Sequence, residues 1–133
     1  MRSISTLKSA YYEIAKRLNA PHRYVRFATT PQHDGSPHIE SNGDELAYVI
    51  TERGVEHERR QTKDDDDILY WLVCELTHKM ASEYELSHRI PAADSRRVLF
   101  QKHTELLGSI NRDWQARKES EYETVLEQHP FCD

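Results

Sequence analysis

The sequence predicts an α+β fold, with a small antiparallel sheet of three or four strands packed against about four helices. Apolar residues recur at helical spacing in four segments, residues 38–62 alternate as strands do, and turn residues separate these runs. The order is one helix, then strands, then three helices, which is typical of α+β folds. At 133 residues the chain suits one hydrophobic core, so we expect residues 1–133 to form a single domain.

The first element is an amphipathic helix predicted over residues 4–19, which Pro21 ends. Its apolar residues follow three- and four-residue steps and are Ile4, Leu7, Tyr11, Ile14, Ala15 and Leu18. The sequence RYVRFA, residues 23–28, is rich in strand-forming residues and predicts a short strand. Residues 29–37 collect Pro, Asp, Gly and Ser, which predicts a long turn.

A meander of strands is predicted from His38 onward. The dipeptide NG at residues 42–43 is the one best suited to a type I′ hairpin, and RG at residues 53–54 marks the next turn. Residues 46–52 between them alternate with period two, which predicts a central strand. Residues 55–62 are polar on both faces apart from Val55, as expected of an exposed edge strand.

A long helix is predicted from an acidic start at residues 62–67 to the break at Ile90-Pro91. Thr or Asp can cap a helix, and carboxylates complement the positive end of its dipole. Four consecutive Asp residues are nevertheless more than capping needs. The apolar stripe of this helix consists of Ile68, Leu69, Leu72, Val73, Leu76, Met80 and Tyr84, with Trp71 beside it.

Two shorter helices are predicted after that break. Residues 92–110 form one helical pattern, built on Leu99, His103, Leu106 and Ile110. Asn111 or Asp113 caps the last helix, which ends before His129-Pro130. Four of its residues are predicted to face inward: Trp114, Tyr122, Val125 and Leu126.

The charge distribution limits the kinds of partner that this protein can bind. The net charge is −5, and residues 31–133 carry twelve bases against twenty-two acids. Such a surface repels phosphates and attracts basic partners, so we expect no nucleic-acid binding. The longest apolar run, residues 68–74, is far short of a membrane span, and the first residues lack the apolar core of a signal peptide. We therefore expect a soluble cytoplasmic protein without a membrane partner.

Few residues suggest catalysis. The turn HDGSPHIE offers His33, Asp34, His38 and Glu40 as possible metal ligands, but their spacing matches no helix-borne ligand pair, and a polar turn is the favoured interpretation. Nucleotide-binding, nucleophile-elbow and CxxC motifs are absent. Two cysteines indicate neither a disulfide framework nor a zinc site. We expect no cofactor and no enzyme activity.

Several strings resemble the immunity protein 63 family of bacterial polymorphic toxin systems, from about residue 20 to the C-terminus. They are DGSPHIE, YVITERGVEHERR, LYWLV, MASEYELSHRI, RRVLFQKHTELLG and RKESEYETVLEQHPF. The resemblance implies a small cytoplasmic protein that binds a cognate toxin domain and blocks it without catalysis. It carries over no established map of contact residues.

The acidic composition and the resemblance together favour a polar contact surface for the toxin, because many such toxins present basic clefts that an acidic surface can occupy. The candidate partner-binding residues are Asp34, His38, Glu40, Glu56, Glu58, Arg59, Asp64, Asp65 and Asp66. Two alternatives stay open: a small metal-dependent enzyme that uses His33, Asp34, His38 and Glu40, and a regulatory adaptor that has no toxin. The sequence does not identify the toxin or the oligomeric state.

Overall fold

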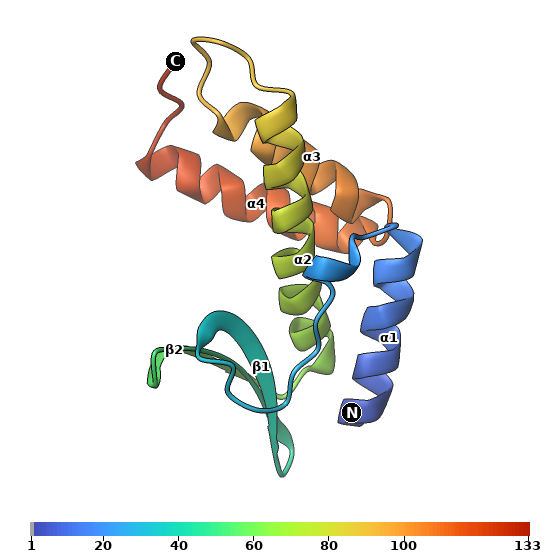
Figure 1. Cartoon of the computed structure of the whole chain (residues 1–133). Helices are drawn as coiled ribbons and strands as arrows, with labels where there is room; N and C mark the ends of the chain where they lie inside the picture. Colours follow the sequence, from blue (N-terminus) through green and yellow to red (C-terminus); the bar gives the residue numbers. More distant parts are fainter. Residues whose placement is uncertain (1) are drawn as a thin grey trace. The chain divides into compact units, whose positions relative to one another are not determined.

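The computed structural model describes residues 2–133, which form four α-helices, one short 3-10 helix and a three-stranded antiparallel sheet (Figure 1). In chain order the elements are α1 (Ile4–Arg17), η1 (His22–Tyr24), β1 (Asp34–Asn42), β2 (Glu45–Glu52), β3 (Val55–Thr62), α2 (Asp65–Ser87), α3 (Arg96–Gly108) and α4 (Arg112–Gln128). The predicted α+β class is therefore confirmed. The backbone divides into two compact units, one ending at Val73 and one from Cys74 to Asp133, with the boundary inside α2. The single-domain expectation stays a prediction.

Helix α1 has a defined cap at each end. The Ser3 hydroxyl accepts a hydrogen bond from the Thr6 backbone N–H at 3.1 Å. At the other end Asn19 has a positive φ of 56°, and the backbone N–H groups of residues 19 and 20 donate to the carbonyls of Lys16 and Ala15. This is a Schellman motif, which ends the helix before Pro21. Four of the predicted stripe residues are buried: Leu7, Tyr11, Ile14 and Ala15.

The short strand predicted at residues 23–28 is wrong. Residues 22–24 form η1 and the following four residues have no regular structure. Contacts with α1 replace a strand ladder here: the Arg26 N–H donates to the Tyr11 hydroxyl at 3.3 Å, and buried Phe27 lies 6.1 Å from the Tyr11 ring. Tertiary packing thus overrides the local strand propensity.

The three strands pair in the order β1-β2-β3, so the central position of β2 and the edge position of β3 are confirmed. The first turn differs from its prediction, since Asn42 pairs with Glu45 and only Gly43 of the two turn residues has positive φ. A type I′ turn at residues 42–43 is therefore wrong; positive φ at the first turn position alone is typical of type II′. Residues 53–54 both have positive φ, as type I′ requires.

One face of the sheet is covered by the first turns of α2. The Tyr48 ring meets the Trp71 ring edge to face, with centroids 6.0 Å apart. The Arg60 guanidinium lies 4.9 Å from the Tyr48 centroid and 5.5 Å from that of Trp71. These aromatic and cation–π contacts hold the first turns of α2 on this face of the sheet.

The start of α2 explains the run of four Asp residues. The Asp64 carboxylate accepts from the Asp66 backbone N–H at 2.9 Å, which makes Asp64 the capping side chain. Asp65 accepts from the Arg2 backbone N–H at 2.6 Å and from its guanidinium, and so ties the start of α1 to the start of α2 (Figure 1). Asp67 accepts from the Thr62 hydroxyl at 2.8 Å. The carboxylates of Asp64, Asp65 and Asp67 thus bind groups of the chain itself.

In the second unit, α3 begins four residues later than predicted. Ala92 has a positive φ of 66°, which a helix does not allow, and the Asp94 carboxylate accepts from the Arg96 N–H at 3.0 Å. Of the two predicted caps of α4, Asn111 and Asp113, the structure has Asn111, whose side chain accepts from the Trp114 N–H. Trp114 is buried as predicted, whereas Val125 is 40% exposed, so its inward position is wrong. Within residues 2–133 no helix is both long and apolar enough to span a bilayer.

Candidate functional site

The second face of the sheet gathers four charged or polar side chains, which we call the sheet-face cluster: His38, Glu40, Glu56 and Arg59. The strand register places His38 and Arg59 on either side of Val49, and Glu40 opposite Ala47. All four residues were among the sequence candidates. The cluster therefore joins the two edge strands across the buried centre of β2.

A β-bulge makes this cluster possible. Ile50 pairs with Glu58, but the next residue of β2, Thr51, pairs with Glu56, so His57 is an extra residue in β3. Side chains three positions apart in a regular strand point to opposite faces. The extra residue returns Glu56 to the face that carries Arg59, as bulges commonly re-aim a side chain.

Arg59 is the centre of the cluster. Its guanidinium donates to Glu40 at 3.0 Å and 3.4 Å, and to Glu56 at 2.7 Å and 3.1 Å. Glu40 also lies 2.8 Å from Nε2 of His38. The carboxylate of Glu40 is therefore held on one side by a guanidinium and on the other by an imidazole, in a fixed orientation.

The electrostatics keep the cluster charged. Hydrogen bonds from Arg59, then from His38, lower the pKa of Glu40, and Arg59 likewise lowers the pKa of Glu56. The two carboxylates in turn raise the pKa of Arg59. Two carboxylates on one guanidinium leave a net negative charge on a surface where Glu40 is 39% and Glu56 47% exposed. The face can accept a cationic side chain from another protein.

His38 supports the cluster from below the surface. Its side chain is only 1% exposed, and the described residues provide no hydrogen-bond partner for its Nδ1. A buried ring does not meet a partner directly, so its role here is to position Glu40 through Nε2.

The other sequence candidates lie apart from the cluster. Asp34 binds Arg26 at 2.9 Å and the Ser36 backbone, and these contacts lower the pKa of Asp34 to about 2. Glu58 pairs with Arg60 on the opposite face of the sheet. Asp64, Asp65 and Asp66 lie at the start of α2, where Asp66 is exposed.

The four residues of the metal alternative do not converge. His33 has positive φ and is exposed in the loop before β1, while Asp34 turns to Arg26 and Ser36. His38 and Glu40 bind each other within the cluster. Among residues 2–133, no group of three or more His, Cys, Asp or Glu side chains is arranged to hold a metal ion.

Sequence reasoning missed a polar relay inside the second unit. The Thr77 hydroxyl lies 3.4 Å from the Cys74 carbonyl oxygen, to which it donates, so it accepts from Nε2–H of His103 at 2.8 Å. Nδ1 of His103 then accepts from the Tyr122 hydroxyl. Burial, with smaller effects of Lys118 and His78, lowers the pKa of His103 to about 3. Burial, with smaller effects of Cys74 and Glu121, raises the pKa of Tyr122. Both shifts keep this neutral chain of hydrogen bonds intact.

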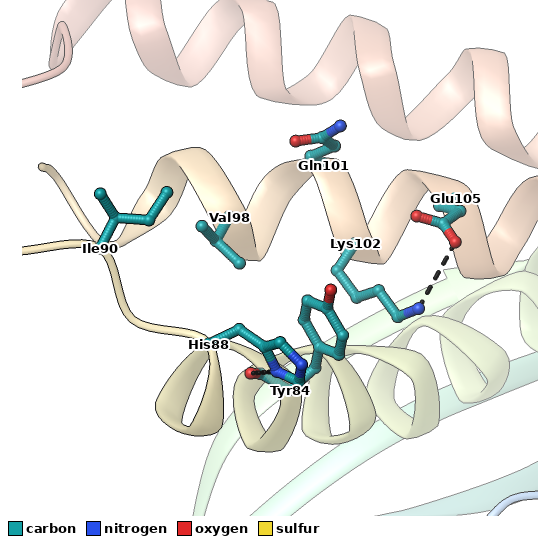
Figure 2. A pocket seen from close by; sticks show the side chains of 7 residues that line it. All are labelled: Tyr84, His88, Ile90, Val98, Gln101, Lys102 and Glu105. Carbon is teal, nitrogen blue, oxygen red and sulfur yellow. Dashed lines mark hydrogen bonds and ion pairs between the residues drawn. The ribbon is translucent and has the colours of Figure 1, made fainter.

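The second unit also has a pocket of about 210 Å³ between the end of α2 and α3. Figure 2 shows the His88 ring lying on the Tyr84 ring, with centroids 3.9 Å apart, and Lys102 reaching toward Glu105. Because Nδ1 of His88 lies 2.9 Å from the Tyr84 carbonyl, it must carry the proton there.

Comparison with protein-family models gives one match, to the family described as Immunity protein 63, over residues 42–124. The chain belongs to the immunity protein 63 family. No curated protein and no solved structure matches the chain.

The matched residues of this immunity protein family member extend from the first hairpin turn into α4. They include Glu56 and Arg59 of the sheet-face cluster, whereas His38 and Glu40 on β1 lie outside them. The match is narrower than the sequence resemblance, which extended from about residue 20 to the C-terminus. Membership in a family of immunity proteins makes the sheet-face cluster a candidate contact surface rather than a catalytic one.

Proposed function

We propose that this immunity protein neutralises a cognate toxin domain by binding it directly, in the cytoplasm of the bacterium that makes both, and without catalysis of its own. Membership in the immunity protein 63 family is the observation that carries the proposal. The sheet-face cluster supports it, since it offers oriented carboxylates with a net negative charge on an exposed face.

The contact surface that we propose is centred on Glu40, Glu56 and Arg59. Arg59 holds both carboxylates before any partner arrives, so binding does not have to order them. Complementary charge of this type raises the association rate and selects the partner, while buried anchors supply most of the affinity. Of the remaining candidates, Asp66 fits a wider rim, and His38 acts through Glu40. Glu58 lies on the opposite face of the sheet and binds Arg60, while Asp34, Asp64 and Asp65 also keep intramolecular bonds.

Co-expression with the toxin gene next to this gene tests the function. Growth should be rescued, and a pull-down should retain a stoichiometric complex. If neither is observed with the neighbouring toxin, the proposal fails and an adaptor without a toxin becomes the better explanation.

The surface is tested with a pair of double variants. Glu40→Gln/Glu56→Gln should slow toxin association and weaken the complex roughly tenfold, with less dependence on salt. Glu45→Gln/Glu52→Gln removes the same charge from the two ends of β2 and should bind as the wild type does. Equal binding by both variants would place the contact surface elsewhere.

A further inference from the structure

A groove of about 300 Å³ runs between α3 and α4 in the second unit. Each helix contributes residues at helical spacing, Arg97, Phe100, Gln101 and Thr104 from α3, and Glu119, Tyr122, Glu123 and Leu126 from α4. Gln101, which Figure 2 shows on the side of α3 away from Lys102, lines both this groove and the pocket of Figure 2, whereas the other residues that α3 contributes to the two differ. The volume of the groove lies at the lower end of the range for ligand sites.

The walls of the groove are aromatic and held in place. The rings of Phe100 and Tyr122 stack with centroids 3.7 Å apart, and Phe131 lies 6.3 Å from Phe100. Arg96 donates to the carbonyls of residues 129 and 130, and Arg97 lies over the Phe131 ring at 4.2 Å. The C-terminal segment is thus fastened as one side of the groove.

The groove carries an unbalanced negative charge. Arg97, the only base among the described residues that line it, is neutralised by Asp133 at 2.7 Å. Glu119 and Glu123 are exposed one helical turn apart, and within the described part of the chain neither forms an ion pair. Like charges at this spacing destabilise a helix. A cation that binds both carboxylates would therefore relieve their repulsion.

The pocket of Figure 2 differs in this respect. Its one carboxylate, Glu105, is already paired with Lys102 at 3.4 Å, and that ammonium lies 4.5 Å from the Tyr84 centroid. No net charge is left there to select a partner. The groove between α3 and α4 is therefore the better candidate for recognition in the second unit.

We propose that this groove takes an arginine side chain presented by a protein partner. Glu119 and Glu123 bind its guanidinium, and Phe100, Tyr122 and Leu126 cover its aliphatic stem. Arginine fits better than lysine because its planar group binds carboxylates in a bidentate manner and stacks on aromatic rings. The identification of the partner as the cognate toxin rests on the proposed function. The preference of the groove for an arginine side chain does not depend on it.

The groove is tested on the full chain by NMR titration with N-acetyl-arginine methylamide, with the citrulline and lysine analogues as comparisons. The arginine probe should shift the signals of Thr104 and Tyr122, and the neutral citrulline probe should not. Glu123→Gln should weaken arginine binding about tenfold, whereas Glu127→Gln, one turn further along α4, should change it less than about twofold. Equal shifts with citrulline, tighter binding of lysine, or equal effects of the two variants would overturn the proposal.

A second arm uses the complex with the neighbouring toxin. Glu119→Gln/Glu123→Gln should weaken that complex about tenfold or more. If the wild type binds and protects while the double variant binds equally well, the groove is not used for the toxin and the inference fails alone. If the wild type gives no protection, the proposed function fails, and the NMR result still decides the chemistry of the groove.

Discussion

Protonation of His103 should make the stability of this protein depend on pH in the range between pH 7 and pH 5. The ring is 1% exposed and lies between Thr77 and Tyr122, with its pKa lowered to about 3 by burial, by Lys118 and by His78. In the unfolded chain the pKa returns to about 6.5, so the unfolded state binds the proton more tightly. This contribution to stability is complete above pH 6.5, declines as the pH falls toward 3, and is then lost.

The size of the effect follows from the two pKa values. Linkage gives a loss of about 2 kcal/mol in the free energy of unfolding between pH 7 and pH 5, and about 4 to 5 kcal/mol once the pH is below the folded pKa. The loss at pH 5 hardly changes if the folded pKa lies anywhere below about 4. Carboxylates with lowered pKa values, such as Glu40, contribute only nearer their ordinary pKa of about 4.3.

Urea unfolding followed by circular dichroism at pH 7, 6 and 5 measures this slope. His103→Gln removes the titrating group and should flatten the dependence of the free energy of unfolding on pH, whatever the stability of the variant at pH 7. His57→Gln on exposed β3 is the matched control and should keep the wild-type slope. If the Gln variant does not fold, NMR titration of the wild-type ring should show it neutral at pH 5. A wild-type slope near zero, or a His103 ring that titrates near pH 6, would refute the reasoning.

Two further predictions concern local structure. Asp64→Ala should lower the free energy of unfolding by about 1 kcal/mol, because it removes the cap that accepts from the Asp66 N–H, while Asp64→Asn keeps an oxygen acceptor there and should change it by less than about 0.5 kcal/mol; urea midpoints compare the two. Gly54→Ala should cost about 1 kcal/mol, because Gly54 has a φ of 79°, and Val55→Ala at the exposed start of β3 is its control in thermal unfolding. Equal changes within either pair would contradict the prediction.

Much of the fold was predictable because local chemistry determines it. Period-two alternation marked β2, the dipeptide at residues 53–54 marked its hairpin, and Asn111 marked the start of α4. The strand predicted at residues 23–28 failed because Tyr11 on α1, distant in sequence, binds the Arg26 N–H. The first hairpin turn shifted by one residue because the ladder extends to Asn42.

The candidate site was predictable only in part. Charged residues on β1 and β3 were evident, but not the bulge at His57 that brings Glu56 and Arg59 to one face. The hydrogen-bonded chain through His103 was not predicted, because His103 lies at a position of the apolar stripe of α3. A residue at such a position is expected to pack in the core. A histidine on such a stripe, with Thr and Tyr on the inner faces of other helices, is the signal that could have found it. Glu119 and Glu123 on α4 are visible in the sequence as two acids four residues apart. The groove beside them is not visible there, because residues of α3 form its other side.

The buried position of His38 lowers the stability of the fold while, in the proposed function, it serves recognition through Glu40. A ring that is 1% exposed, with no partner for Nδ1 among the described residues, costs about 1 to 3 kcal/mol of desolvation. Glu40 is 39% exposed and can be solvated without it, so the imidazole serves the orientation of the carboxylate more than the fold. His38→Leu should therefore leave the free energy of unfolding unchanged or raise it by about 1 kcal/mol, and yet weaken toxin binding severalfold. Urea unfolding and binding kinetics on the same preparation, with Glu40→Gln as the reference for lost binding, separate the two effects. A variant that loses more than about 2 kcal/mol of stability but binds normally would show that His38 serves the fold instead.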